Sequence, residues 1–360
     1  MYPTNELLRR LSMQHPIIQA PMAGGADTPA LVAGVGEAGG FGFIGAAYLS
    51  PERTLAAAAE IRSRTSRPFG VNLFAPLPVP ELPDDADLAV ALIAPFYAEI
   101  GLDPPTVPDP PIDDFGEKLE AAVESGASAL SFTFGLPPPE AMVSAKRHGL
   151  VLIGTATTVD EGRELQAVGV DAVVAQGSEA GGHRGTFASA VSSSLVGTMA
   201  LVPQMVDALE VPVIASGGIM DGRGIAAALA LGAEAVQMGT AFLTTDEAGA
   251  ADVYREAILD AGDSDTQITT AFSGRAARGI VNRVMTEIDA DGAILPFPYQ
   301  NALTRPLRSA ATSQNDAEYL SLWAGQGVGM ARTMPAGELM ARLVDETHEA
   351  VRRLSDLYPD

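Results

Sequence analysis

Short apolar runs alternate with helix-like segments along most of this chain. The runs are nearly continuous in hydrophobic character, which is typical of strands that are buried on both faces of a parallel sheet. We predict eight such strands, at residues 16–21, 41–46, 69–74, 129–132, 150–155, 171–176, 212–217 and 235–240.

The helix-like segments between these runs lie at residues 28–39, 51–64, 117–126, 138–149, 159–169 and 222–232. Several begin at Pro or with an acidic first turn and end at Gly, as helices do. Strands that alternate with helices predict a parallel sheet covered by helices. Eight units, rather than five or six, favour an α/β fold of the closed (β/α)8 type, the TIM barrel, over an open doubly wound sheet.

Two regions interrupt this alternation. Residues 76–115 are rich in Pro and Asp and contain one helix-like piece, so we predict an insertion after the third strand. Barrel enzymes carry such loops on the face that holds the active site. The chain after residue 245 holds helix-like pieces at 250–262, 316–325 and 335–354. We therefore expect a barrel over residues 1–245, followed over 246–360 by its last helix and a helical cap above its mouth.

The composition limits the class of protein. With 47% hydrophobic and 19% charged residues, the 360-residue chain can bury a large core and is not disordered. It has no cysteine, which excludes disulfides, thiolate nucleophiles and metal or iron–sulfur sites built on Cys. IMP dehydrogenase-like chemistry, which needs a Cys nucleophile, is thereby excluded. No metal-binding motif is visible, and we expect no metal.

The formal charge of −23, from 45 acidic and 22 basic residues, disfavours nucleic acid and anionic membranes as partners. No segment has the length and hydrophobicity of a membrane helix, and the N-terminus lacks the pattern of a secretory signal. A cytoplasmic protein is expected. An anionic substrate would need a local cationic position to overcome the overall field.

The sequence QGSEAGGHRGT, residues 176–186, is the strongest candidate for chemistry. It follows a predicted strand and surrounds His183 with four glycines, and none of the other three histidines lies among glycines. The C-terminal end of a barrel strand is where catalytic residues lie. We expect His183 to be catalytic, and Arg184 beside it to offer positive charge or hydrogen bonds to a ligand.

Two further glycine-rich segments close the last two predicted strands, ASGGIMDGRG at 215–224 and QMGTAFL at 237–243. In TIM barrels, the loops after strands seven and eight form a common phosphate site. Gly217, Gly218 and Gly239 would let the backbone approach the phosphate. Ser216 and Thr240 would add hydroxyl donors.

Other strand ends are less specific. Met22, in QAPMAGG at 19–25, is either a core residue or a soft surface against a flat ring. Asn72, in an otherwise apolar strand, needs a hydrogen-bond partner, which either a flavin or neighbouring backbone would supply. Gly34, Gly36 and Gly39 spell GxGxxG. This pattern ends a helix and leads into a strand, the reverse of a dinucleotide site, so we reject it.

Together, QAPMAGG, GVNLF (70–74), VVAQGSEAGGHRGTF (173–187), PVIASGGIMDGRG (212–224) and QMGTAFL resemble the nitronate monooxygenase family, formerly called 2-nitropropane dioxygenases. The resemblance runs from about residue 14 to the end of the sequence. It includes the Pro- and Asp-rich insertion, SFTFGLP (131–137), and the C-terminal segments LTRPLR (303–308) and LWAGQG (322–327). It implies an FMN-binding barrel without a metal. Phe297 stands where some members have Tyr, which bears on the substrate pocket.

Position by position, the resemblance implies the following roles. Asn72, Gln176, Gly181 and Gly218 would contact FMN, and Met22 would lie against its ring. The phosphate would be surrounded by Gln237, Met238, Gly239 and Thr240. His183 matches the active-site histidine, and Tyr254 and Arg305 would face the substrate.

The implied activity is FMN-dependent oxidation of alkyl nitronates, such as propionate 3-nitronate, by O2 to a carbonyl compound and nitrite, a detoxification. His183 would hydrogen-bond the nitro oxygens, or act as a base if a neutral nitroalkane is used. An NAD(P)H-dependent quinone or enoyl-thioester reductase on the same barrel stays an alternative, as does a non-catalytic flavin or phosphate binder. The sequence does not decide the oligomeric state, and a homodimer is one option.

Overall fold

The computed structural model describes residues 6–109, 114–291 and 293–357. Its centre is a closed barrel of eight parallel strands, in the order β1-β2-β3-β4-β5-β6-β8-β9. The barrel closes where β9 pairs with β1, with Ile17 opposite Val236. The strands are β1 (Ile17–Gln19), β2 (Phe41–Gly45), β3 (Gly70–Phe74), β4 (Ala129–Thr133), β5 (Val151–Ala156), β6 (Ala172–Gln176), β8 (Val213–Ser216) and β9 (Ala235–Met238).

The predicted TIM barrel is confirmed, because each of the eight predicted strands overlaps one strand of the barrel. The helices that cover it are α2 (Pro29–Glu37), α3 (Pro51–Arg64), α5 (Phe115–Glu124), α6 (Pro139–Arg147), α7 (Val159–Val168), α8 (Thr198–Ala208), α9 (Gly222–Ala230) and α14 (Ala336–Leu357). The sequence did not indicate α8, whose interior contains Pro203. The GxGxxG glycines lie in α2 and the turn after it, so their rejection as a dinucleotide site agrees with the fold.

The barrel interior is filled at one end. Alternate strand residues, among them Ile18, Phe43 and Val174, point inward and pack with Leu7, Leu8, Leu11 and Met13. Leu7 and Leu8 lie on the short helix α1 (Glu6–Arg10). Because this end of the barrel is occupied by side chains, a ligand can reach the fold only from the opposite end, where the strands terminate.

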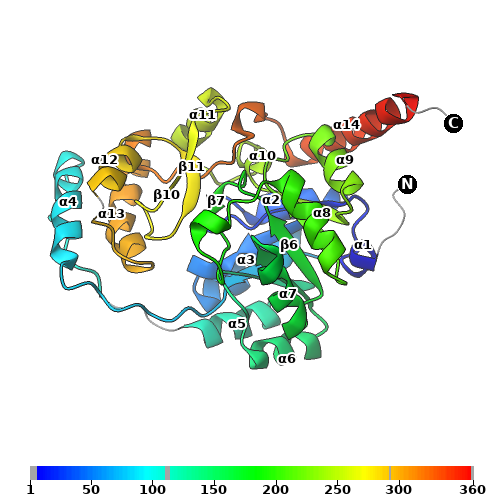
Figure 1. The fold of residues 1–360 in the computed structure, drawn as a ribbon, viewed down its shortest axis with the longest axis horizontal. Helices are drawn as coiled ribbons and strands as arrows, with labels where there is room; N and C mark the ends of the chain where they lie inside the picture. Colours follow the sequence, from blue (N-terminus) through cyan, green and yellow to red (C-terminus); the bar gives the residue numbers. More distant parts are fainter. Residues whose placement is uncertain (1–5, 110–113, 292, 358–360) are drawn as a thin grey trace.

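A second lobe stands beside that open end (Figure 1). It has its own hydrophobic core, formed by α4 (Ala86–Glu99) from the predicted insertion together with residues from 243–328. Its other elements are α11 (Asp252–Asp260), α12 (Arg283–Asp291), α13 (Tyr299–Gln314), β10 (Thr266–Thr269) and β11 (Ala277–Ile280). Tyr97 Oη donates to Leu303 O at 2.5 Å, which joins the insertion to α13. The domain boundary at residue 245 stays a prediction.

The helix expected at 316–325 is wrong. Only the single turn η3 (Ala317–Tyr319) forms there, and residues 321–325 are neither helix nor strand. Its backbone is used in pairing between distant segments, since Ile280 N donates to Leu322 O at 2.8 Å and Gln326 N donates to Glu179 O at 2.9 Å. This segment therefore lies along the rim of the barrel and contributes residues to the site described next.

The last barrel helix comes from the end of the described chain. α14 packs against α9 and α2, and so completes the ring of helices outside β9 and β1. Between β9 and α14 lie the short helix α10 (Thr240–Leu243), most of the second lobe and η4 (Val328–Met330). The remaining turns are η1 (Ala46–Tyr48), directly after β2, and η2 (Val191–Ser193).

Candidate active site

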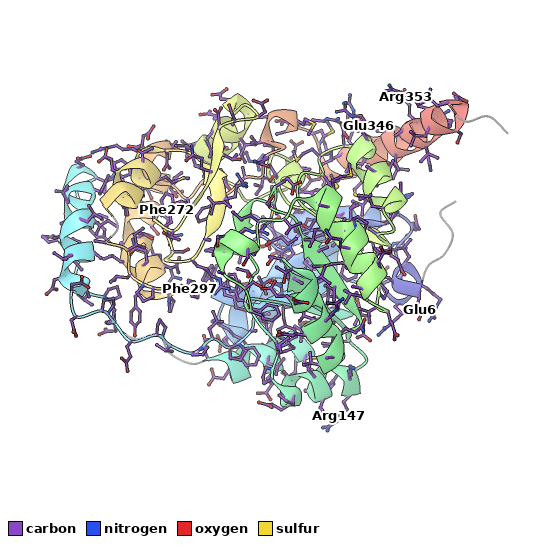
Figure 2. The ribbon with its side chains drawn as sticks, in the orientation of Figure 1. Glu6, Arg147, Phe272, Phe297, Glu346 and Arg353 are labelled. Atoms are coloured by element: carbon purple, nitrogen blue, oxygen red, sulfur yellow. The ribbon has the colours of Figure 1, made fainter. Side chains whose placement is uncertain are left out.

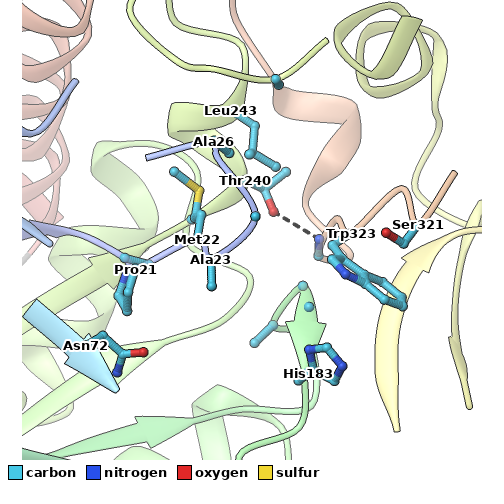
Figure 3. Close-up of a pocket in the computed structure, with 18 of the residues that line it drawn as sticks. Pro21, Met22, Ala23, Ala26, Asn72, His183, Thr240, Leu243, Ser321 and Trp323 are labelled. Carbon is cyan, nitrogen blue, oxygen red and sulfur yellow. Dashed lines mark hydrogen bonds between the residues drawn. The ribbon is translucent and has the colours of Figure 1, made fainter. Parts of the chain in front are cut away.

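A cavity of about 600 Å³ opens at the C-terminal ends of the barrel strands. This is a volume typical of small-molecule sites. Apart from Arg184, the residues that the sequence assigned to cofactor, substrate or catalysis line it. These residues are Met22, Asn72, Gln176, Gly181, His183, Gly217, Gly218, Gln237, Met238, Gly239, Thr240, Tyr254 and Arg305. Figure 3 shows Met22, Asn72, His183 and Trp323 around the open space.

His183 is held in place by a short strand that the sequence did not indicate. Residues Gly182–His183 form β7, which pairs with β11 of the second lobe in the order β10-β11-β7. The side chain of Gln176 holds the loop after β6 in place. Its Nε2 donates to His183 O at 3.0 Å, and its Oε1 accepts from Gly185 N at 2.8 Å. The histidine thus lies between the two lobes on a rigid support.

The hydrogen bonds of His183 determine which nitrogen carries its proton. Nε2 lies 2.9 Å from Ser273 Oγ, and that hydroxyl donates its own hydrogen to Arg275 O at 3.0 Å. Because that hydroxyl has a carbonyl acceptor, the arrangement favours Nε2–H as the donor to Ser273 Oγ, with Nδ1 as the unprotonated nitrogen. Nδ1 has no partner among the described residues and is not sealed in the interior, so it is open to the cavity.

The surroundings of His183 keep the imidazole neutral. Burial is the main cause that lowers its pKa to about 3, and the positive charges of Arg275 and Arg308 act in the same direction. Rings enclose it, with centroids 5.7 Å away for Phe134, 6.4 Å for Phe297 and 5.4 Å for Trp323. A neutral imidazole whose Nδ1 faces an apolar enclosure can accept a hydrogen bond or a proton from a ligand.

Arg184 does not face the cavity, contrary to expectation. Its side chain is fully buried, and it donates to Gly177 O at 2.6 Å, Gln176 O at 3.0 Å and Ser194 O at 3.1 Å. The backbone carbonyls of the loop after β6 need donors, and the guanidinium supplies them. Arg184 therefore stabilises the loop that carries His183.

The loops after β8 and β9 form one end of the cavity. Gly217 and Gly218 have φ values of +112° and +71°, a region that side chains with Cβ rarely adopt. A Cβ at Gly217 would also lie 3.0 Å from Ala180 N. Thr240 Oγ1 accepts from Gly325 N at 3.0 Å, which leaves its hydroxyl hydrogen free to donate. This end therefore offers backbone amides and hydroxyl donors, a donor set that suits an anion such as phosphate.

Gly181 was expected to allow contact with FMN, but the structure shows a different reason for a residue without a side chain. A Cβ at this position would lie 2.5 Å from Gly325 N and 2.6 Å from Ala324 C. The close approach at Gly181 is thus to the rim segment 324–325. Contact between Gly181 and a cofactor stays a prediction.

The opposite wall of the cavity contains Asn72 and Met22. Asn72 Nδ2 donates to Ser131 Oγ at 2.8 Å and to Ser131 O at 3.2 Å. Neighbouring groups therefore supply the partner of the Asn72 nitrogen, while a contact between its oxygen and a flavin stays a prediction. Met22 lies on the loop after β1, and its N–H donates to Asp27 Oδ2 at 2.6 Å.

The carboxyl group of Asp27 holds that loop by accepting from Met22 N–H, and its burial predicts that stability depends on pH. Burial raises its pKa to about 7, although the N–H groups of Met22 and Gly45 act in the opposite direction. Between pH 4 and 7 the folded state then binds more protons than the unfolded state, so the contribution of Asp27 to stability is lost as pH rises through that range. Replacement by Asn is expected to flatten this loss in denaturant unfolding measured from pH 5 to 8. The exposed Asp207→Asn serves as control, and an unchanged slope in Asp27→Asn would contradict the assignment.

Two of the predicted substrate residues differ in exposure. Tyr254 is directed to the rim segment, since its Oη donates to Trp323 O at 2.5 Å, and burial raises its pKa. The hydroxyl hydrogen of Tyr254 is therefore used in this hydrogen bond and is not available to a ligand. Arg305 lies exposed at the outer end of the cavity.

Sequence reasoning missed Arg308, Ser273 and Trp323. Arg308 follows Arg305 by three residues on α13, so both lie on one helix face and both line the cavity. That spacing within LTRPLR was the available signal. Ser273 gave no signal, and Trp323 stood only within the segment LWAGQG, because tertiary packing alone brings both beside His183.

Two searches of the described residues returned nothing. No group of three or more His, Asp or Glu side chains within 6–109, 114–291 and 293–357 is arranged to hold a metal ion. In the same ranges, no helix has the length and hydropathy needed to cross a membrane.

Comparison with known proteins gives matches over nearly the whole chain. A family model described as nitronate monooxygenase matches residues 5–346. A relative from Staphylococcus saprophyticus, described as "Probable nitronate monooxygenase", is 42% identical over 346 residues, which cover 95% of this chain and 97% of the relative. A relative from Bacillus subtilis with the same description is 43% identical over 344 residues, 95% of this chain and 99% of the relative.

Solved structures are similar over the whole length. A nitroalkane oxidase from Streptomyces ansochromogenes has a TM-score of 0.91 at 40% identity, and the match covers 98% of this chain and 100% of that one. FabK from Thermotoga maritima has a TM-score of 0.78 at 30% identity, over 99% of each chain.

Proposed function

This chain belongs to the nitronate monooxygenase family, and from that premise we propose that it binds FMN and oxidises alkyl nitronates with O2 to a carbonyl compound and nitrite. One observation carries the proposal. A single cavity joins the loops after β8 and β9, the amide of Asn72 and the open nitrogen of His183.

The cavity fits FMN by the chemistry of its lining. Gly217, Gly218 and Thr240 would hold the phosphate through N–H and O–H donors. Asn72 Oδ1 would accept from a ring N–H, and Met22 would pack on the ring face. When bound, FMN would take up electrons from the substrate, and O2 would reoxidise it.

The lining also fits an anionic substrate. Among the described residues around the cavity are Arg53, Arg305 and Arg308, and none of these lining residues is Asp or Glu. This is unusual in a chain that carries 45 acidic residues. The cavity therefore offers the local positive charge that an anionic nitronate needs against a net charge of −23.

His183 suits proton abstraction better than donation. In its neutral form Nδ1 carries a lone pair toward the cavity, so it accepts from a ligand and cannot donate to a nitro oxygen. We infer that His183 also removes the α-proton of a neutral nitroalkane, forming an imidazolium beside the new nitronate anion. The attraction between these two charges would offset the low pKa of the free imidazole. The similarity to a nitroalkane oxidase agrees with this role.

The experiment that tests the function is an anaerobic titration of the purified protein, followed by its visible spectrum. We expect a yellow protein whose flavin absorbance falls when propionate 3-nitronate is added, and nitrite formation when air is admitted. A yellow protein that neither bleaches nor consumes the nitronate would refute the proposal. The same titration with NADH and NADPH decides the alternative, since rapid bleaching by either would favour an NAD(P)H-dependent reductase.

A further inference from the structure

Deprotonation of a nitroalkane is helped by a hydrogen-bond donor next to the base. When the α-proton leaves, the electron pair of the C–H bond moves into the C–N bond, and negative charge collects on the two nitro oxygens. Donors placed where charge develops lower the barrier of such a step. His183 does not supply one, because its Nδ1 accepts and its Nε2 is bound to Ser273 Oγ at 2.9 Å. Since the α-carbon and the nitro group are directly bonded, the donor must lie beside the imidazole.

Trp323 lies beside His183 at the wall of the cavity. Their ring centroids are 5.4 Å apart, and the half-buried indole is among the lining residues. Its Nε1–H can donate a hydrogen bond but cannot accept one. No hydrogen bond joins Nε1 to any other residue within 6–109, 114–291 and 293–357, and the atom is not sealed in the interior. Indole N–H groups in partly buried positions usually have a partner, so this one is available to a ligand.

The edge of the indole that carries Nε1 is turned away from β11. A Cβ at Gly279 on β11 would lie 3.0 Å from Trp323 Cε3, so a glycine at this position lets the Cε3 edge approach the strand. Cε3 and Nε1 are on opposite edges of an indole. The Nε1 edge therefore faces the cavity, and Figure 3 shows the indole beside His183 at the border of the open space.

Contacts on several sides hold the indole in this position. The backbone carbonyl of Trp323 accepts from Tyr254 Oη at 2.5 Å. The ring of Phe272, which lies in the second lobe (Figure 2), stands edge-on to the indole with centroids 5.6 Å apart. A donor that the fold holds in place needs no reorganisation when charge appears on the substrate. Tyr254, which the sequence assigned to the substrate, would then act through Trp323.

We propose that Trp323 is a second catalytic residue, whose Nε1–H donates to a nitro oxygen of the substrate. This inference rests on the proposed function and deepens it. His183 Nδ1 takes the α-proton, the C–H electron pair becomes the second bond between carbon and nitrogen, and an N–O electron pair moves onto the oxygen that faces Trp323. The products of this step are a nitronate and an imidazolium, and no electron leaves the substrate. A substrate that arrives as a nitronate would use the same hydrogen bond for binding.

Trp323 is the single tryptophan of the chain, which allows a test at one atom. Expression in a tryptophan-requiring host supplied with benzothienylalanine changes this position alone, and it puts a sulfur in place of the N–H while the ring system keeps its size. We expect kcat/KM for nitroethane to fall by about tenfold or more, since hydrogen bonds to charged groups are the stronger class. Propionate has the planar, two-oxygen shape of ethyl nitronate. Its binding to the holoenzyme, measured by isothermal titration calorimetry, should weaken by a similar factor.

Trp323→Phe keeps an aromatic ring, removes the N–H and provides a second variant if the sulfur-containing protein does not fold. Phe272→Leu is the matched control, because it loosens the packing on the indole and leaves the N–H in place. Its kcat/KM for nitroethane and its affinity for propionate should stay near those of the wild type.

Unchanged kcat/KM and propionate affinity in the sulfur-containing protein would overturn the proposal. Equal losses in Phe272→Leu would also overturn it, because they would assign the effect to packing. A loss of FMN from the sulfur-containing protein would do the same, because it would assign the N–H to the cofactor.

The outcome is separable from the proposed function, because calorimetry does not depend on turnover. If the sulfur-containing protein binds propionate more weakly but the wild type consumes no nitronate, the donor role of Trp323 stands and the oxidation fails. If the wild type oxidises nitronates, and the sulfur-containing protein matches it in kcat/KM and in propionate affinity, the oxidation stands and the role of Trp323 fails.

Discussion

Replacing His183 with Asn is expected to lower kcat/KM for a neutral nitroalkane by about 10²–10⁴-fold, the usual contribution of a positioned general base. The same variant should lose about tenfold or less with the corresponding nitronate, because that substrate has already lost its proton. The difference follows from the geometry, in which Ser273 takes the Nε2 hydrogen and leaves Nδ1 free to accept. Steady-state rates with nitroethane and ethyl nitronate measure it.

The pH profile provides a second readout for His183. A base must be unprotonated to act, so activity toward nitroethane falls as pH drops below its pKa. Because burial and two arginines hold that pKa at about 3, kcat/KM should show no acidic limb between pH 5 and 8. Ser273→Ala, which frees Nε2, should lower the rate with nitroethane more than the rate with the nitronate. Equal losses on both substrates in His183→Asn would mean that the residue binds the anion and does not remove a proton.

Replacing Glu161 with Ala is expected to lower the free energy of unfolding by roughly 3–5 kcal/mol. Glu161 is fully buried on α7, and its carboxylate accepts five hydrogen bonds. The donors are Thr157 N and Oγ1 at 2.7 Å each, Thr186 Oγ1 at 2.7 Å, Phe187 N at 2.8 Å and Ala188 N at 3.1 Å. Alanine would leave four of these donors unsatisfied, since only Thr186 Oγ1 has another acceptor, Ser189 O at 3.1 Å. It would also remove the anchor of residues 186–188, next to the His183 loop.

Urea unfolding at neutral pH tests this expectation, with Glu164→Ala on the exposed face of the same helix as control. The wild-type contribution should also depend on pH. Burial opposes the charge of Glu161, but the hydrogen bonds outweigh it and lower its pKa. Its stabilisation is therefore complete above the ordinary carboxyl pKa and is lost as pH falls through the lowered value. A Glu161→Ala variant within about 1 kcal/mol of wild type would show that the five donors find other partners.

The strands and the glycine loops were predictable because their signals are local. An apolar run such as 150–155 indicates a buried strand by itself. Glycines at the end of such a run, such as Gly217 and Gly218 at the end of 212–217, indicate a turn. The sheet β10-β11-β7 could not be predicted from the sequence, because β7 has only two residues and β11 contains the polar Arg278. Only the contact between the lobes makes these segments pair.

The same distinction separates the site residues. His183 stood out because its neighbours in sequence are glycines, whereas Ser273 and Arg308 depend on neighbours in space. Arg305 and Arg308 look alike in the sequence, yet one is exposed and the other is partly buried behind Asn301. Arg184 was misjudged for the same reason, since adjacency to His183 did not reveal that its guanidinium turns inward to backbone carbonyls.

The position of α14 in the chain has a consequence for biosynthesis. The barrel lacks the helix between α9 and α2 until residues 336–357 have been made, although its last strand ends at Met238. During translation, the seam between β9 and β1 therefore stays uncovered while the whole second lobe is synthesised. A nascent chain that still lacks residues 336–357 would therefore expose apolar surface of the kind that chaperones recognise. Folding of the barrel should therefore finish only when α14 emerges from the ribosome, and a message truncated before codon 336 should yield an aggregation-prone product.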